Sequence, residues 1–186
     1  CNLTEINGGK CVTKEDFFLA CRAGAILGTL QAGYTDFKFL PDTTKDIFDR
    51  EALLGVSITG WMNNPDILFN AEILEEGANI VRQVNREVAE VIGINAAART
   101  TCVKPSGNAS VLLQTASGIH AEHSNMYIRN VQMNKESEVT QAIQKTNPHM
   151  VEESVWSAGG TDVVVSFPIL PKEGSMLKDE LIVSLE

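Results

Sequence analysis

The sequence predicts an α/β fold with mostly parallel strands. Segments with helical periodicity alternate with short, β-branched apolar segments along the 186 residues. Helix-capping residues and turns that contain glycine or proline separate these segments. Because such alternation is typical of parallel sheets covered by helices, we expect ligand sites at the carboxyl ends of the strands.

The first predicted helix begins after Thr13 and runs to about residue 32. Thr13 and Asp16 have the spacing of a capping box, in which each side chain satisfies a backbone amide of the other residue. Apolar side chains then recur every three to four residues, as on the buried face of a helix. The segment YTDFKFLPDTTK ends this pattern, and a second, shorter helix is expected at about residues 44–52.

The segment LLGVSITGWM, residues 53–62, predicts a buried strand because it is apolar, rich in β-branched residues and bounded by turn residues. A turn with a helix cap is expected at Asn63-Asn64-Pro65. A long helix follows at about residues 71–92, and Gly93 suits its C-terminal end. A further strand is expected at residues 98–103.

The last third of the chain is predicted to hold two strands and a helix. Residues 126–133 and 162–169 read as strands, residues 135–145 as a helix, and residues 158–161 as a turn. The ending KDELIVSLE reads as the beginning of a helix or strand, and residue 1 is Cys, not Met. We find no repeat and no internal linker, so residues 1–186 are expected to be a fragment of a single domain, incomplete at both ends.

Composition and charge narrow the functional classes. A net charge of −9, from 24 acidic and 15 basic residues, argues against binding to nucleic acid or to anionic membranes. No apolar stretch reaches the ~18 residues of a membrane span, and no signal peptide is visible. The four cysteines lack the spacing of a zinc site or a CxxC pair. We therefore expect a cytoplasmic protein in a reducing compartment.

One strand-to-helix turn has the features of a phosphate site. In TTCVKPSGNASVLL, residues 100–113, a β-branched run ends at Lys104-Pro105 and a helix is expected to begin after Gly107. Free amides at a helix N-terminus favour an anion, and Gly107 lets the backbone approach it closely. Lys104 adds charge, and hydroxyl or amide donors are present at Ser106, Asn108 and Ser110. From the residues alone, an ordinary helix cap explains the turn equally well, and the Walker pattern is absent.

Five segments resemble a known enzyme family. They are CNLTEI (1–6), LLGVSITGWMNNPDIL (53–68), AARTTCVKPSGNAS (97–110), SGIH (117–120) and NPHMVEESVWSAGGTD (147–162). In this order they are similar to the catalytic barrel of adenosylcobalamin-dependent ribonucleoside-triphosphate reductases, the monomeric class II ribonucleotide reductases. The resemblance implies part of a ten-stranded α/β barrel with the ribonucleotide bound at its mouth.

The resemblance also implies the roles of individual residues. The PSG-type loop holds the substrate phosphates in this family, which assigns that role to Pro105, Ser106, Gly107, Asn108, Ala109 and Ser110. The family often has Thr at the position of Asn108, whose side-chain amide can still donate. Cys1 matches one member of the active-site redox pair, whose partner lies upstream in the family, as does the radical-bearing cysteine.

The activity implied is reduction of ribonucleoside triphosphates to 2′-deoxyribonucleoside triphosphates, as needed for DNA replication. Adenosylcobalamin, through its cobalt–carbon bond, would generate a thiyl radical that takes the 3′ hydrogen of the ribose. The cysteine pair would then reduce the sugar and become a disulfide, which a thioredoxin-like partner reopens. Because the radical cysteine lies upstream, residues 1–186 alone are expected to be inactive.

The cysteines have other readings as well. Cys1 could simply be the point where a fragment starts, or a protein-splicing junction, and Cys11 is a second candidate partner for Cys1. Cys21, on the apolar face of the first helix, and Cys102, inside a strand, are expected to be core residues.

The remaining polar and aromatic candidates favour structural roles. Two histidines, His120 and His123, could bind a metal but lack a third ligand, so hydrogen bonding is favoured. Glu152 and Glu153 read as a solvated pair. Trp61 and Trp156 could serve either in packing or in base stacking. Arg129 could either contact the substrate phosphate or form a surface ion pair.

Two alternatives to the class II activity remain open. One is a class I or class III ribonucleotide reductase, which would work without cobalamin. The other is a non-catalytic nucleotide-binding module, which would bind nucleotide without turnover.

Overall fold

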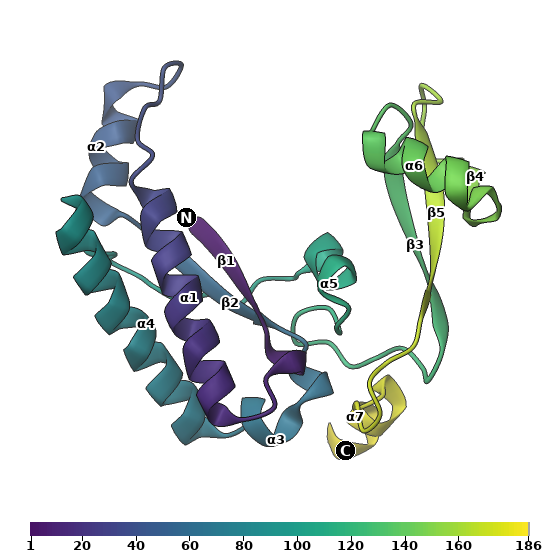
Figure 1. Cartoon of the computed structure of the whole chain (residues 1–186), viewed down its shortest axis with the longest axis horizontal. Helices are drawn as coiled ribbons and strands as arrows, with labels where there is room; N and C mark the ends of the chain where they lie inside the picture. Colours follow the sequence, from purple (N-terminus) through teal and green to yellow (C-terminus); the bar gives the residue numbers. More distant parts are fainter. Residues whose placement is uncertain (186) are drawn as a thin grey trace. The chain divides into compact units, whose positions relative to one another are not determined.

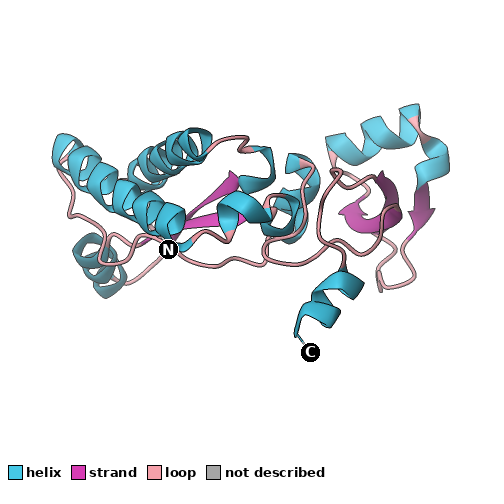
Figure 2. Cartoon of the chain, turned by 90° about the horizontal axis from the view of Figure 1, so that it is seen from below, coloured by secondary structure: helices cyan, strands magenta, loops and turns pink. Residues whose placement is uncertain are grey.

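The computed structural model describes residues 1–185, and these residues form two compact units. The first unit comprises residues 1–122 together with the segment from Lys172 onward, and the second comprises His123–Pro171. Figure 2 shows helices, in cyan, and strands, in magenta, in the mixed α/β arrangement that the sequence predicts.

The first unit contains two strands and six helices among the described residues. They are β1 (Asn2–Asn7), α1 (Lys14–Ala32), α2 (Asp42–Glu51), β2 (Leu54–Thr59), α3 (Pro65–Leu68), α4 (Ala71–Ile92), α5 (Gly107–Leu113) and α7 (Lys178–Leu185). Short 3₁₀ turns cover Gly8–Lys10 and Trp61–Asn63. The predicted helices at 13–32, 44–52 and 71–92 are confirmed as α1, α2 and α4.

Local capping explains where these helices begin and end. Thr13 Oγ1 accepts a hydrogen bond from the Asp16 amide, and the Asp16 carboxylate accepts one from the Thr13 amide. Hydrogen bonding of the Asp16 carboxylate to the Thr13 amide above all, and then to the Thr13 side chain and the Val12 amide, lowers the pKa of Asp16. Asn70 caps α4 through its side-chain oxygen, and Gly93 ends α4 in the left-handed region at φ 75°.

The sheet of the first unit is parallel. β1 pairs with β2 in a register that sets Leu3 beside Gly55 and Glu5 beside Ser57. Figure 1 shows α1 and α4 on one side of these strands and α5 on the other. β1 was not predicted as a strand, because its polar sequence NLTEIN lacks the apolar content of β2.

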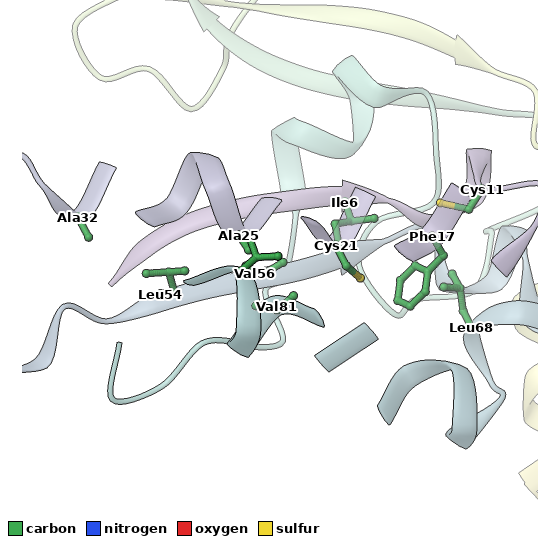
Figure 3. Close-up of a cluster of buried hydrophobic side chains, with 11 residues drawn as sticks. Ile6, Cys11, Phe17, Cys21, Ala25, Ala32, Leu54, Val56, Leu68 and Val81 are labelled. Atoms are coloured by element: carbon green, nitrogen blue, oxygen red, sulfur yellow. The ribbon is translucent and has the colours of Figure 1, made fainter. Parts of the chain in front are cut away.

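The hydrophobic core lies between the strands and the helices α1 and α4 (Figure 3). Leu54 and Val56 of β2 pack there against Phe17 and Cys21 of α1 and Val81 of α4. Cys21 is 3% exposed, and burial raises the pKa of its thiol to about 12. The prediction that Cys21 is a core residue is therefore confirmed.

The second unit is an antiparallel sheet with one helix. It contains β3 (Tyr127–Asn134), α6 (Glu138–Thr146), β4 (Val151–Glu153) and β5 (Asp162–Ile169), with strand order β3-β5-β4. β4 and β5 are joined by a short turn that contains Gly160 at φ 62°, and strands joined so closely can only run antiparallel. The expectation of mostly parallel strands therefore holds in the first unit and fails in the second.

Within the described residues, no helix combines the length and the apolar character that a membrane span requires.

Candidate functional site

The polar site of the first unit lies on the face of the sheet opposite to α1 and α4. Side chains alternate along a strand, so the burial of Leu54 and Val56 against the helices turns Gly55 and Ser57 to the other face. Their neighbours in the register, Leu3 and Glu5, share that face. Cys1 lies two residues before Leu3 and thus on the same side.

A third extended segment, residues 99–103, lies along the other edge of β2. The amides of Leu54 and Val56 donate to the carbonyls of Arg99 and Thr100, and the Cys102 amide donates to the Val56 carbonyl. Of the strand predicted at 98–103, the structure has only an isolated parallel bridge between Thr101 and Val56. The hydrogen bonds just described nevertheless hold a longer part of the segment beside β2. The segment delivers Lys104 to the end of β2.

Lys104 joins both strands at the polar face. Its amide donates to Ser57 Oγ over 3.1 Å, and its Nζ lies 3.3 Å from Glu5 Oε2. The side chains of Lys104 and Glu5 are 30% and 10% exposed, so this ion pair is better shielded from solvent than a surface pair. The pair fixes the start of the predicted phosphate turn against β1.

The thiols of Cys1 and Cys102 both lie close to Gly55, on the polar face of the sheet. A Cβ atom at Gly55 would lie 2.9 Å from Cys1 Sγ and 2.8 Å from Cys102 Sγ, so only a residue without a side chain fits beneath them. Burial raises the pKa of the Cys102 thiol; the Lys104 ammonium opposes that shift and the Glu5 carboxylate adds to it. The prediction that Cys102 is a core residue is wrong, because its side chain lies beside Cys1 on the polar face and not among α1 and α4.

The turn after Lys104 has an unusual backbone. Ser106 has φ 55°, in the left-handed region that side chains other than glycine rarely adopt, and is 2% exposed. The Ser117 hydroxyl contacts the carbonyl oxygens of Pro105 and Ser106, both at 2.9 Å. Gly118, at φ 54°, lies so close that a Cβ there would be 3.0 Å from the Lys104 carbonyl oxygen. The second loop therefore holds the turn in its strained shape.

This second loop, residues 115–118, is held by the end of β2. Thr59 Oγ1 donates to the Ala116 carbonyl and accepts from the Gly118 amide. Asn63 Oδ1 accepts from Thr115 Oγ1 and the Ala116 amide, both at 2.6 Å. These contacts fix the second loop, which in turn supports the turn at 104–110, and none of them involves a residue of the turn itself.

Asn63 also forms hydrogen bonds to two further segments of the chain. Its Nδ2 donates to Glu122 Oε1 at 3.0 Å and to Ser175 Oγ at 2.8 Å. Asn63 and Glu122 are 6% and 3% exposed, so this is a buried polar cluster. The loss of Asn63 would therefore remove a hydrogen bond from each of these buried or partly buried partners.

The turn offers backbone groups more than side chains. Ser110 is fully buried and its hydroxyl donates to the Gly107 carbonyl, so among the three side chains predicted as donors only Asn108 is exposed. A Cβ at Gly107 would meet no atom within 4 Å, which leaves the space above its backbone open. The first amides of a helix have no partner within the helix, so α5 presents them at this opening.

Three buried polar atoms near this face have no hydrogen-bond partner among the described residues: Glu5 Oε1, Asn7 Oδ1 and Ser106 Oγ. Asn7 anchors α5 by donating through Nδ2 to the Leu113 carbonyl. Buried polar groups are nearly always paired in folded proteins, so these atoms point to polar ligand atoms or ordered water at this face.

The other predicted candidates lie elsewhere or have structural contacts. Cys11 is buried in the core, at the opposite end of β1 from Cys1. His120 lies 2.9 Å from the Ser117 carbonyl, and no group of three possible metal ligands occurs in the described part of the chain. Trp61 packs against Phe69, as expected, whereas Trp156 is 84% exposed and does not pack.

The second unit holds the remaining candidates. Glu153 forms an exposed ion pair with Lys135, which agrees with a solvated Glu152-Glu153 pair. Arg129 lies 3.0 Å from the Tyr127 hydroxyl and over its ring.

Known proteins resemble this chain over most of its length. It is 27% identical over 129 residues to the adenosylcobalamin-dependent ribonucleoside-triphosphate reductase of Euglena gracilis, covering 68% of the chain and 17% of that protein. It is also 27% identical over 180 residues to a probable enzyme of the same name from Dictyostelium discoideum, covering 94% of the chain and 23% of that protein. The chain's homologues are adenosylcobalamin-dependent ribonucleoside-triphosphate reductases. The resemblance read from the five sequence motifs is confirmed.

The fold agrees with this relationship. A solved B12-dependent class II ribonucleotide reductase superposes with a TM-score of 0.60 at 17% identity, covering 94% of the chain and 28% of that protein. No protein-family model matches. The chain spans less than a quarter of the length of the two reductases from Euglena and Dictyostelium, and the ten-stranded barrel stays a prediction.

Sequence reasoning missed the residues that support the site in this reductase homologue. Glu5, Gly55, Ser57 and Asn63 were not singled out as site residues, although all four lie inside the motifs that carried the resemblance. Alternation along two paired strands could have placed Glu5, Ser57 and Cys1 on one face, but only after β1 had been recognised as a strand.

Proposed function

We propose that the protein containing this chain reduces ribonucleoside triphosphates to 2′-deoxyribonucleoside triphosphates. The observation that carries the proposal is the shared face: the strand that begins after Cys1 and the turn that begins at Lys104 are joined on one side of the sheet by the Glu5–Lys104 ion pair. A thiol and an anion site are thereby held in a fixed relation, as a nucleotide with a reacting ribose and a charged tail requires.

The turn would hold the phosphates. The amides at the start of α5 carry partial positive charge, and the open space above Gly107 lets phosphate oxygens reach them. Lys104 contributes a full positive charge at the entrance to the turn. The residues assigned to this role are those predicted from the sequence, 105–110, in which the backbone donors begin after Pro105 and Asn108 is the exposed side-chain donor.

Cys1 would supply half of the reducing equivalents. In the overall reaction the C2′–O bond of the ribose breaks, a C2′–H bond forms, and two thiols become one disulfide while water is released. Cys1 is exposed on the polar face, where a substrate ribose and later a reductant could reach it. Its redox partner is proposed to lie upstream of this chain, and a thioredoxin-like dithiol to reopen the disulfide.

Adenosylcobalamin, when bound, would supply the radical that starts the reaction. An apolar cavity of the first unit, lined by core residues such as Phe17, Ile58 and Val81, has a volume of about 380 Å³. That volume suits a small ligand and not a corrin ring with its nucleoside. These residues therefore do not fit the cofactor, and we assign no step of the reaction between this chain and cobalamin.

Turnover by the full-length protein tests the proposal. We expect deoxyribonucleotide formation with adenosylcobalamin and a dithiol, loss of turnover in Cys1→Ser with nucleotide binding retained, and a raised KM in Gly107→Val. Gly159→Val, at an open turn of the second unit, is the control. Turnover without cobalamin would favour a class I or class III enzyme, and nucleotide binding without turnover would favour a binding module.

A further inference from the structure

A polar hollow of about 400 Å³ lies between α4 and the segment that leads to the phosphate turn. Its lining residues are Arg82, Asn85, Arg86, Ala96, Ala97, Ala98, Arg99, Thr100 and Thr101, all in the first unit. Three arginines and two threonines thus line one space. None of these residues belongs to the turn at 104–110.

The three arginines have no acidic partner in the part of the chain that the structure describes. Within the described residues, no carboxylate oxygen lies within 4.0 Å of Arg82, Arg86 or Arg99. Arg82 donates to the Asn79 side chain and Arg99 to the carbonyl of Ala98, and these contacts use one of the five N–H donors that a guanidinium group has. In a chain of net charge −9, such an unpaired basic cluster is unexpected.

The cluster also opposes helix stability. Arg82 and Arg86 are four residues apart on α4 and therefore lie on the same side of the helix. Like charges at this spacing repel each other, and the repulsion disappears when an anion binds between them. Arginine suits a phosphate in particular, because its planar fork can donate two parallel hydrogen bonds.

Hydrogen bonds hold the wall of the hollow in place. Asn85, which is 1% exposed, donates to Thr29 Oγ1 at 2.9 Å and accepts from the Ala97 amide at 2.8 Å. The Ala98 amide donates to the Glu51 carbonyl. The segment that carries Arg99 is thereby fixed against α4 before any ligand arrives, so little ordering is needed for binding.

We propose that this hollow binds the phosphates of a small oligophosphate, as a second anion site separate from the turn before α5. A small ligand fits the volume, whereas a nucleic acid is disfavoured by the net charge of the chain. The inference rests on these arginines and does not require the proposed reductase activity.

Calorimetric titration of the full-length protein with inorganic tripolyphosphate tests the site. The substituted protein is Arg82→Ser/Arg86→Ser, and the control is Lys14→Ser/Arg22→Ser, which removes two exposed basic side chains from α1 with the same change in net charge. Tripolyphosphate binding is also measured for each double variant combined with Gly107→Val, so that binding at the turn is separated from binding at the hollow.

We expect the Arg82/Arg86 substitution to weaken tripolyphosphate binding at one site by about tenfold or more, with and without Gly107→Val, and the control to change it little. If the turn before α5 does not hold phosphate, Gly107→Val will leave tripolyphosphate binding unchanged while the arginine effect persists, so failure of the proposed phosphate turn is distinguished from failure of this inference. A second titration with ATP distinguishes a free oligophosphate from a nucleotide as the ligand. If ATP and tripolyphosphate bind with equal affinity, the hollow holds the phosphates alone. If ATP binds more tightly, the hollow also contacts the nucleoside. Affinity within twofold of the unsubstituted protein in Arg82→Ser/Arg86→Ser, or equal weakening in the control, overturns the inference.

Discussion

Lys104 Nζ lies 3.3 Å from Glu5 Oε2, and this ion pair fastens the turn before α5 to the strand that begins next to Cys1. The contact crosses 99 positions of sequence and spans the intervening strand β2. It is the link through which a thiol and a phosphate site would keep a constant separation.

Breaking this pair should loosen the turn. Glu5→Gln keeps the shape of the side chain but leaves the partly buried ammonium of Lys104 without its counter-charge, so we expect unfolding free energy to fall by about 1–3 kcal/mol. A double-mutant cycle with Lys104→Met, read from thermal or denaturant unfolding, measures the coupling. Strictly additive effects of the two substitutions would mean that the pair contributes nothing.

Gly55 should tolerate no side chain. In Gly55→Ala the added methyl group would collide with the sulfur atoms of Cys1 and Cys102, and overpacking of this kind costs about 1–3 kcal/mol. Because Cys1 is exposed and can move aside, we also expect a changed rate of reaction between Cys1 and a thiol reagent. An unchanged rate together with unchanged stability would contradict the close approach of the two thiols.

Asn63 should be essential to the shape of the site although it lies outside the turn. Asn63→Ala removes one hydrogen bond each from the Ala116 amide, the Thr115 hydroxyl and the Glu122 carboxylate, and we expect the free energy of unfolding to fall by about 3 kcal/mol or more. Asn95→Ala, which removes a single exposed hydrogen bond to Asp49, is the matched control and should cost well below half as much. Equal losses in the two variants, measured by denaturant unfolding, would argue against the buried cluster.

Alkaline pH should destabilise the first unit through Cys21. Its thiol has a pKa of about 12 in the folded chain against a usual value of 9.0. The folded state thus keeps a proton that the unfolded state loses, so stability is full below pH 9 and falls between about pH 9 and 12. The slope should approach about 1.4 kcal/mol per pH unit. Cys21→Ala should flatten this part of the pH profile of unfolding, and an unaltered profile would exclude Cys21 as its cause.

The elements predicted from sequence were those with strong local signals. Thr13 and Asp16 mark the start of α1 and Gly93 the end of α4, because caps are determined by a few neighbouring residues. β1 and β4 escaped prediction, since NLTEIN is polar and VEE is only three residues long. Both strands form because a partner strand satisfies their backbone groups, which no local pattern reveals.

The site was predicted in part. The turn at 104–110 follows the end of a β2-paired segment, as expected for an α/β protein, and it carries exposed backbone. The neighbourhood of Cys102 and Cys1 and the support by Asn63 depend on strand register and on loops distant in sequence. Neither the strand register nor contacts with distant loops can be predicted from the pattern of one segment at a time.

The most direct test of the account is whether one bound nucleotide reaches both the turn and Cys1. In the full-length protein, the rate of Cys1 alkylation by iodoacetamide can be followed by peptide mass spectrometry with and without a saturating ribonucleoside triphosphate. We predict that the nucleotide slows alkylation of Cys1 several-fold, that Gly107→Val removes this protection, and that Gly159→Val retains it. Equal alkylation rates with and without nucleotide, under conditions where binding is saturated, would contradict a shared site.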